Sequence, residues 1–500
     1  MLFNSYEFIF VFLPVTLAGF FWLGHHGRAR WAIGWLVLAS FFFYGWWNPK
    51  YLALLGGSVL FNYSMGLALS RRVRTGAGRA LMIAGVAANL LLLGVFKYTN
   101  FLVDNFNALC GTDWQVARII IPLGISFFTF QQIAYLVDAW RGETREYNFV
   151  DYALFVTFFP QLIAGPIVHH KEMLPQFSQR GVFRFSPRDF AIGVSIFAVG
   201  LFKKAVIADG VAGYSTPVFD LAKNGGTPGF AQAWGAVLAY TLQIYFDFSG
   251  YSDMAIGLGR LFGIVLPLNF HSPYRAANII EFWRRWHMTL SRFLRDYLYF
   301  TLGGNRRGPA RRYLNLMLTM LLGGLWHGAG WTFVIWGGLH GVYLMINHGW
   351  RALRRRWGHD LERSSLAGRA LSGAVTFLAV VVAWVFFRAE TLPAALAMLG
   401  AMTDLSALGE VTPAGLSAAA RQIAVTGALL CVVWFFPNTQ QIMARVGPAL
   451  NFPESATGTA AVARWWQWRP TAGWALAAAA VFLIAVLHLN KVTEFLYFQF

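Results

Sequence analysis

Charged residues are scarce in this 500-residue chain. They make up 12% of it, whereas hydrophobic residues make up 57% and aromatic residues 17%. An ordinary soluble domain, in which about a quarter of the residues are charged, is therefore excluded, and a polytopic membrane protein is predicted. Negatively charged residues are scarcer than positively charged ones: the chain has 22 aspartates and glutamates and 40 lysines and arginines, which gives a net charge of +18. The basic residues lie mostly in short connections between apolar runs, as in cytoplasmic loops, so membrane topology explains the charge without nucleic acid.

Cysteine is almost absent. Cys110 and Cys431 each lie in a largely apolar setting, and no CxxC pair or His/Cys cluster has the spacing of metal ligands. We therefore expect neither a structural disulfide nor a metal site. The N-terminus also lacks a charged leading region and a small-residue cleavage site before its apolar run, so it is expected to be a retained first span.

Charge is missing altogether from Tyr313 to Trp350. As a helix this run would measure about 57 Å, which exceeds a ~30 Å hydrocarbon core, so we predict that it lies in a membrane and is broken or folded back. Four glycines bracket His327 and supply a place for the break: Gly323, Gly324, Gly328 and Gly330. An imidazole inside such a run indicates a functional site. The alternative is a core histidine bonded to a carbonyl or hydroxyl group.

The remaining apolar runs predict an all-α fold of about eleven transmembrane helices with additional re-entrant and interfacial helices. The basic turns at 25–30 and 71–79 place the N-terminus outside. Proline and glycine interrupt some central runs, which we interpret as bent or re-entrant segments that enclose a cavity. A single integral domain, 1–500, is the simplest division. The runs lie near 5–24, 31–47, 51–69, 80–96, 119–137, 150–168, 188–208, 232–250, 370–387, 421–436 and 471–489.

The connection from His271 to Arg312 is strongly basic, with nine arginines against one glutamate and one aspartate, a net charge of +7. Within it, 282–299 laid on a helical wheel separates an apolar arc from an arginine arc and predicts one interfacial amphipathic helix. His287 falls on the apolar arc and should face inward. A belt at the lipid headgroups is the alternative explanation for the arginines.

Two aspartates, Asp247 and Asp253, follow an apolar run together with Ser249, Gly250 and Ser252. We expect them to pair with nearby arginines or to cap a helix rather than to act in catalysis. Ser252 or Asp253 is the expected cap of a helix over 254–261.

These residues also carry a resemblance to a known family. The stretches 283–291 (WRRWHMTLS), 295–299 (RDYLY), 303–306 (GGNR), 321–329 (LLGGLWHGA) and 336–341 (WGGLHG) resemble the membrane-bound O-acyltransferase family, and more narrowly its bacterial alginate O-acetyltransferase branch. The opening MLFNSYEFIFVFLP and the stretches 159–166, 245–257 and 495–500 also resemble that branch. The resemblance spans essentially the whole chain.

The resemblance implies acetyl transfer from acetyl-CoA at a cytoplasmic opening, through a central tunnel towards the outer face. In the family the histidine of the WHG motif is catalytic, which is His327 here, and the position of His287 is a second active-site residue. A hydroxyl that attacks a thioester needs a base near neutral pH, and imidazole titrates there. We expect His327 to be the general base and His287 to orient the thioester or support the oxyanion. The expected acetyl-CoA contacts are Arg284, Arg285, Arg295 and Trp326, and His340 is expected to be structural.

The family also implies a separate extracytoplasmic acyltransferase of the SGNH type, working with polysaccharide synthesis and export machinery at the bacterial inner membrane. The C-terminal stretch 495–500 is a candidate contact for that partner, with an interfacial aromatic anchor as the alternative. One position departs from the alginate branch, because Gln161 stands where alginate enzymes tend to have histidine. Branches that acetylate cellulose or peptidoglycan share the other motifs, so the acceptor polymer stays open.

Two other functions compete. A transporter with proton-relaying histidines would show inverted repeats, and none is apparent in the sequence. A D-alanyl transferase of cell-wall polymers would share the histidine motifs but take its acyl group from a carrier protein. The +7 connection favours acetyl-CoA over a carrier without deciding between them.

Overall fold

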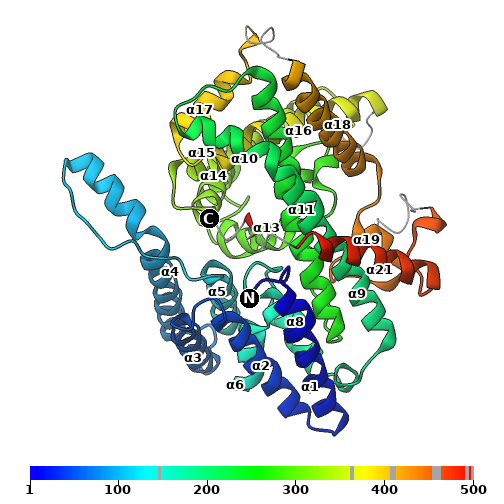
Figure 1. Cartoon of the computed structure of the whole chain (residues 1–500). Helices are drawn as coiled ribbons and strands as arrows, with labels where there is room; N and C mark the ends of the chain where they lie inside the picture. Colours follow the sequence, from blue (N-terminus) through cyan, green and yellow to red (C-terminus); the bar gives the residue numbers. More distant parts are fainter. Residues whose placement is uncertain (145–147, 361–364, 406–412, 453–462, 490–494, 497–500) are drawn as a thin grey trace. The chain divides into compact units, whose positions relative to one another are not determined.

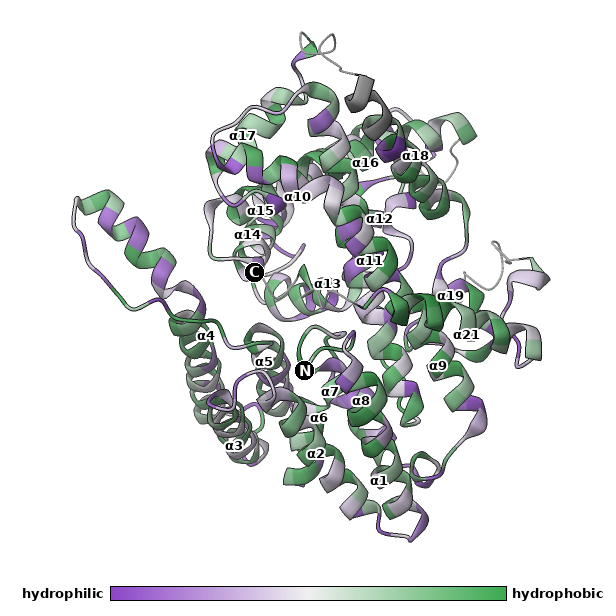
Figure 2. Ribbon diagram, in the orientation of Figure 1, coloured by the Kyte–Doolittle hydropathy of each residue, from purple (hydrophilic) through white to green (hydrophobic). Residues whose placement is uncertain are grey.

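The computed structural model describes residues 1–144, 148–360, 365–405, 413–452, 463–489 and 495–496. The described part is built from helices and contains no β-strand, only an isolated bridge between Pro267 and Leu450. The predicted all-α class is therefore confirmed. Figure 2 shows hydrophilic residues in the turn between α1 and α2 and hydrophobic residues along α21, as expected of apolar spans joined by polar connections.

The residues form two compact units (Figure 1). The first comprises Met1–Phe202, Gly250–Leu268 and Ile442–Gln499, and the second comprises Lys203–Ser249 and Asn269–Gln441. One helix, α11 (Phe230–Leu261), contributes residues to both units. The single integral domain expected from the sequence stays a prediction.

In the first unit the predicted apolar runs form helices close to their expected positions. α1 packs on α2, α5 packs on both α3 and α4, and α9 packs on α21. The helices are η1 (Phe8–Phe12), α1 (Leu13–His25), α2 (Ala29–Gly45), α3 (Tyr51–Ser70), α4 (Gly76–Cys110), α5 (Ile125–Arg141), α6 (Phe149–Thr157), α7 (Phe159–Leu162), α8 (His170–Phe177), η2 (Arg180–Phe183), α9 (Pro187–Phe202), η7 (Ala444–Val446), η8 (Arg464–Trp466) and α21 (Ala472–Leu487).

In the second unit α14 packs against α15, α15 against α16, and α10 against α17. The elements are η3 (Lys203–Ala208), α10 (Asp209–Lys223), η4 (Pro273–Arg275), α12 (Ile279–Trp283), α13 (Met288–Phe293), η5 (Leu294–Tyr299), α14 (Gly308–His327), α15 (Trp331–Arg356), α16 (Leu366–Arg388), α17 (Leu392–Ala401), α18 (Pro413–Phe435) and, at the end of the unit, α19 (Thr439–Ile442).

Five helical stretches of the described chain are long and apolar enough to cross a membrane: Phe8–His25, Tyr51–Ser70, Gly76–Cys110, Pro187–Lys223 and Leu366–Arg388. Shorter apolar helices lie at Ala29–Gly45, Leu392–Ala401, Ala419–Phe435 and Ala472–Leu487. The chain thus has the helices of a multi-pass membrane protein, while the count of eleven spans stays a prediction.

Two predictions about helix ends have different outcomes. The run near 150–168 is interrupted as expected, because α6 ends at Thr157 and the short α7 contains Pro160. The predicted helix start at Met254 is wrong, because α11 runs without a break through Gly250, Ser252 and Asp253. Burial explains the difference: residues 236–259 of α11 are buried almost without exception, and packing on all sides holds a helix together across a glycine.

Candidate active site

His327 is the last residue of α14, at the tip of a helical hairpin. Gly328 and Gly330 are extended, and α15 then runs back along α14, side by side with it in Figure 1. The predicted fold-back of the uncharged run is therefore confirmed. The two helices approach closely at Gly324 and Gly337, where a methyl group on either glycine would overlap the backbone of the other helix. This close contact holds the end of α14, and with it His327, against α15.

Aromatic rings surround the His327 side chain, which is 4% exposed. Its ring centroid lies 4.9 Å from that of Trp326, 5.0 Å from Trp336 on α15 and 5.3 Å from Phe387 on α16. The Trp336 and Phe387 contacts are edge-to-face, which fixes the plane of the imidazole. Three helices therefore position this side chain.

His287 lies where the predicted helix 282–299 is broken. Instead of one helix, this stretch forms the end of α12, a turn, α13 and the π-helical η5, so the prediction of a single amphipathic helix is wrong. His287 adopts a left-handed backbone conformation, with φ 42° and ψ 54°. Such a conformation is costly for a residue with a side chain, and tertiary contacts must sustain it. The predicted inward orientation is correct, because His287 is 0% exposed.

Asn269 supplies those contacts. Its backbone carbonyl accepts a hydrogen bond from the Met288 amide at 3.0 Å. Its side-chain oxygen lies 3.1 Å from His287 Nδ1 and accepts hydrogen bonds from the Thr289 amide at 3.3 Å and the Thr289 hydroxyl at 2.9 Å. The ring of Phe248 packs edge-on against the imidazole, with centroids 4.8 Å apart. Burial lowers the pKa of His287 to about 3, so the ring is neutral near pH 7.

The structure brings the two histidines together although forty residues separate them. Their ring centroids are 6.4 Å apart, and Trp326 contacts both rings. Trp326 itself is 4% exposed. The result is a buried, mostly aromatic site with two imidazoles, in which low polarity strengthens any hydrogen bond to a reacting group.

His340 is fully buried, and it contacts Trp336, which also contacts His327. Its ring packs against Phe282, Trp283 and Trp336, with centroid distances of 6.0, 5.1 and 4.8 Å. In the described part of the chain neither of its ring nitrogens has a hydrogen-bond partner. The aromatic packing agrees with the expected structural role, which stays a prediction.

Two of the three arginines expected to meet acetyl-CoA form ion pairs within the chain. Arg285 is tied to Glu281 by a 2.7 Å ion pair, and Arg295 pairs with the adjacent Asp296 at 2.7 Å. Arg284 is exposed and forms no ion pair with any described residue. Trp326 is the one member of the expected set that contacts the histidines.

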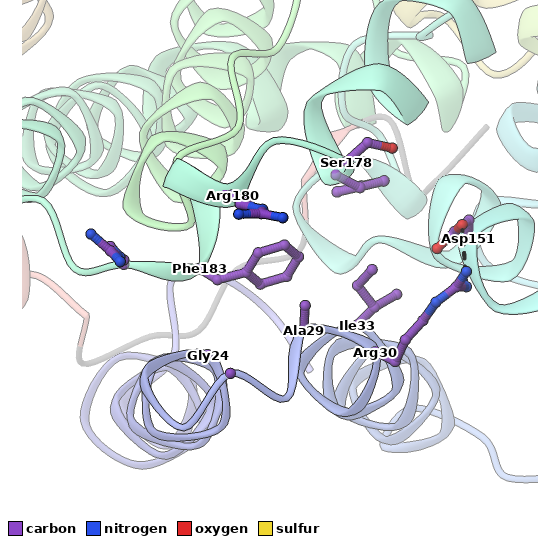
Figure 3. Close-up of a pocket in the computed structure, with 11 residues that line it drawn as sticks. Gly24, Ala29, Arg30, Ile33, Asp151, Ser178, Arg180 and Phe183 are labelled. Atoms are coloured by element: carbon purple, nitrogen blue, oxygen red, sulfur yellow. Dashed lines mark ion pairs between the residues drawn. The ribbon is translucent and has the colours of Figure 1, made fainter.

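A separate basic cavity of about 520 Å³ lies in the first unit (Figure 3). Three arginines border it, Arg30, Arg180 and Arg184, and Asp151 lies 3.6 Å from Arg30. Figure 3 shows the Phe183 ring and the Ile33 side chain turned toward the cavity, so apolar side chains line it together with the arginines. The basic turn at 25–30 is visible in the sequence, but this cavity is not, because Arg180 and Arg184 come from a distant segment.

A buried ion-pair cluster was also missed. Lys204 Nζ lies 2.8 Å from Asp209 Oδ1 and 2.8 Å from Asp247 Oδ1, and the Lys204 and Asp247 side chains are each 2% exposed. Asp247 was expected to pair with an arginine or to cap a helix, but it pairs with a lysine from η3. The signal was present in the sequence, because Lys204 is embedded in the apolar run 188–208. Such a residue needs a counter-ion.

The structure also describes Phe495 and Gln161, two positions noted in the sequence. Phe495 is 1% exposed and packs edge-on against Tyr251. Because 497–500 lie outside the described residues, the contact of 495–500 with a partner stays a prediction. Gln161 is buried, and its side-chain amide donates to the Phe155 carbonyl at 2.7 Å. Among the described residues no group of three or more histidine, cysteine, aspartate or glutamate side chains is placed to hold a metal ion.

The chain has the helices of a multi-pass membrane protein and two buried histidines whose ring centroids lie 6.4 Å apart. The chain belongs to the membrane-bound O-acyltransferase family, whose model matches residues 125–372, a range that contains both histidines. The chain is therefore an enzyme that transfers acyl groups, and its relatives include O-acetyltransferases.

Three relatives show which proteins this chain is similar to. The chain is 47% identical to the Peptidoglycan O-acetyltransferase of Helicobacter pylori over 432 residues, 81% of this chain and 80% of that protein. It is 40% identical over 514 residues, the full length of both, to the Probable alginate O-acetylase AlgI of Pseudomonas putida. It is 26% identical to the Teichoic acid D-alanyltransferase of Streptococcus thermophilus over 287 residues, 53% of this chain and 68% of that protein. The predicted resemblance to the alginate O-acetylase-like branch is confirmed.

Proposed function

We propose that this protein takes acetyl groups from cytoplasmic acetyl-CoA and passes them through the bacterial inner membrane for O-acetylation of an extracytoplasmic polysaccharide, by way of an SGNH-type partner acyltransferase. One observation carries the proposal: the buried rings of His287 and His327 lie 6.4 Å apart, and both contact Trp326. All three residues lie within the range that the family model matches. An imidazole is suited to accept a proton from a hydroxyl group.

In the proposed reaction the oxygen of an acceptor hydroxyl forms a bond to the acetyl carbonyl carbon. The hydroxyl proton passes to His327, the bond between the carbonyl carbon and sulfur breaks, and the departing thiolate takes the proton back from His327 to leave as CoA thiol. The aromatic walls exclude water, which would otherwise hydrolyse the thioester. The chain's own residues thus hold and move one proton at a dry site.

The acceptor polymer is proposed to be an alginate-like exopolysaccharide. Full-length similarity to proteins named alginate O-acetylases supports it. Peptidoglycan is the second candidate, favoured by the 47% identity to a peptidoglycan O-acetyltransferase. D-alanyl transfer has weaker support, because that relative matches only about half of this chain.

The first test is turnover of radiolabelled acetyl-CoA by the full chain in nanodiscs, with a candidate SGNH-type acyltransferase and either alginate or peptidoglycan fragments as acceptor. We expect label to move to the partner protein or to one polymer. Label on neither, from preparations that elute as a single folded species, would overturn acetyl transfer. D-alanine transfer from a carrier protein would then be measured in its place.

A second prediction locates the acetyl-CoA phosphates. If the connection in the second unit binds them, the double variant Arg284→Gln/Arg295→Gln should raise the acetyl-CoA KM by about tenfold or more, because a hydrogen bond to a charged group contributes about 1.5–3 kcal/mol. The turnover number, kcat, should change little. The triple variant Arg30→Gln/Arg180→Gln/Arg184→Gln should leave KM as it is. Arg28→Gln, from the same turn as Arg30 but outside the cavity lining, is the matched control. The opposite pattern would assign the phosphates to the cavity in Figure 3.

A further inference from the structure

The hydrogen bonds around Asn269 determine which nitrogen of His287 carries the proton. A backbone amide can only donate a hydrogen bond, and the Thr289 amide points at the side chain of Asn269. The atom that it meets must therefore be the oxygen of the carboxamide and not the NH2 group. That same oxygen lies 3.1 Å from His287 Nδ1.

The carboxamide oxygen of Asn269 can only accept hydrogen bonds, so the His287 nitrogen that faces it must be a donor. Nδ1 of His287 must therefore carry the hydrogen, and in a neutral imidazole the other nitrogen, Nε2, then carries the lone pair. Burial keeps the ring neutral, since it lowers the pKa of His287 to about 3. A neutral ring in this tautomer cannot donate from Nε2, which is what support of an oxyanion would demand.

We propose that Asn269 is a positioning residue that holds His287 in the Nδ1–H tautomer, so that His287 Nε2 faces the site in acyl transfer as a hydrogen-bond acceptor and not as a donor to the oxyanion. This inference rests on the proposed function and excludes oxyanion support, one of the two roles expected for His287 from the sequence. The strained backbone of His287 agrees with it. The Met288–Asn269 and Thr289–Asn269 bonds hold the left-handed turn in the position where the carboxamide meets Nδ1.

The charged and titratable groups near His287 leave this assignment undisturbed. On α14 the facing titratable group is His327, with its ring centroid at 6.4 Å. On α11 the nearest acid in sequence is Asp247, which is held by Lys204. In the turn before His287, Arg285 is paired with Glu281. The side chains that touch the ring from α11 and from the segment before η4, Phe248 and Phe270, are uncharged.

The direct test is nitrogen NMR of the full chain in nanodiscs, labelled with 15N-histidine and assigned by difference with His287→Gln. We expect a pyrrole-type signal for Nδ1 and a pyridine-type signal for Nε2 of His287. Asn269→Leu, which keeps the size but removes the acceptor, should shift the ring to a mixture of tautomers. A wild-type ring with its proton on Nε2 would overturn the proposal. This readout needs no turnover, so it stands even if the proposed acetyl transfer fails.

Kinetic measurements on Asn269 variants distinguish whether His287 Nε2 accepts or donates a hydrogen bond. Asn269→Leu should lower kcat by about tenfold or more, as the loss of a tautomer-fixing partner does elsewhere, with KM within about twofold. Asn269→Asp keeps the acceptor but adds a carboxylate, which raises the pKa of His287 by about 1–3 units. Below its raised pKa the ring is charged and has lost its lone pair. The activity of this variant should therefore approach wild type at pH 8 and fall more steeply than wild type as the pH drops through the raised pKa to about 4.

The matched control is Asn438→Asp. Asn438 lies beside another histidine, His271, in the same unit, and its side chain also bonds to Ser272. This variant should keep the wild-type pH profile. An Asn269→Asp enzyme that becomes more active as the pH falls would show that His287 works as a donor. Equal loss of activity at pH 8 in Asn269→Asp and Asn269→Leu would show that the residue does not act through its acceptor oxygen. Either result overturns the proposal.

Discussion

Replacing His327 with alanine should lower acetyl transfer by about 10²–10⁴-fold, the contribution of a positioned general base. The imidazole is the proton acceptor in the proposed reaction, and alanine supplies no other. The protein should still insert and fold, because the substitution adds neither charge nor bulk to a site whose shape depends on Trp336 and Phe387 and on the glycine contact between α14 and α15.

Radiolabel transfer from acetyl-CoA measures this effect, and gel filtration in detergent measures folding. Because alanine leaves a cavity, His327→Gln serves as the second variant: it fills most of the space and forms hydrogen bonds but cannot take up the proton. We expect both variants to be inactive and monodisperse. Wild-type-like transfer by either variant would disprove the role of His327 as the base.

Replacing Lys204 with methionine should destabilise the protein by about 3–5 kcal/mol, the usual result of removing one partner from a buried ion pair. The change leaves Asp247, 2% exposed, and Asp209 without the ammonium group that lies 2.8 Å from each of them. A carboxylate inside an apolar helical core costs several kcal/mol unless it is paired or takes up a proton. We expect a large drop in the melting temperature measured in detergent.

The control is Lys223→Met. Lys223 pairs with Glu390 at the surface, where the two side chains are 45% and 52% exposed, and such pairs contribute about 0–1 kcal/mol. Its melting temperature should stay within a few degrees of wild type. Adding Asp247→Asn to Lys204→Met should recover part of the lost stability, since it removes the uncompensated charge. Equal melting temperatures for Lys204→Met and Lys223→Met would show that the buried cluster contributes little.

The two histidines of the site differ in how far the sequence predicted their surroundings. His327 was identified by its position in an uncharged, glycine-interrupted run, and the break at Gly328–Gly330 follows from the same pattern. His287 was correctly predicted to face inward, but the helix that was expected to carry it does not form. Helical periodicity in 282–299 describes which side chains are buried. It cannot report the left-handed turn at His287, which hydrogen bonds from Met288 and Thr289 to Asn269 stabilise.

The sequence by itself determined the membrane class, the positions of most helices and the two histidines of the site, because these depend on composition, on local hydrophobic runs and on motifs. Tertiary structure alone decided the pairing of Lys204 with Asp247, the placement of Trp326 against both imidazoles, and the contact between Asn269 and His287. Each of these joins residues from different elements. Hydrophobic patterning shows only that a side chain is buried; which polar group it meets depends on how the helices pack.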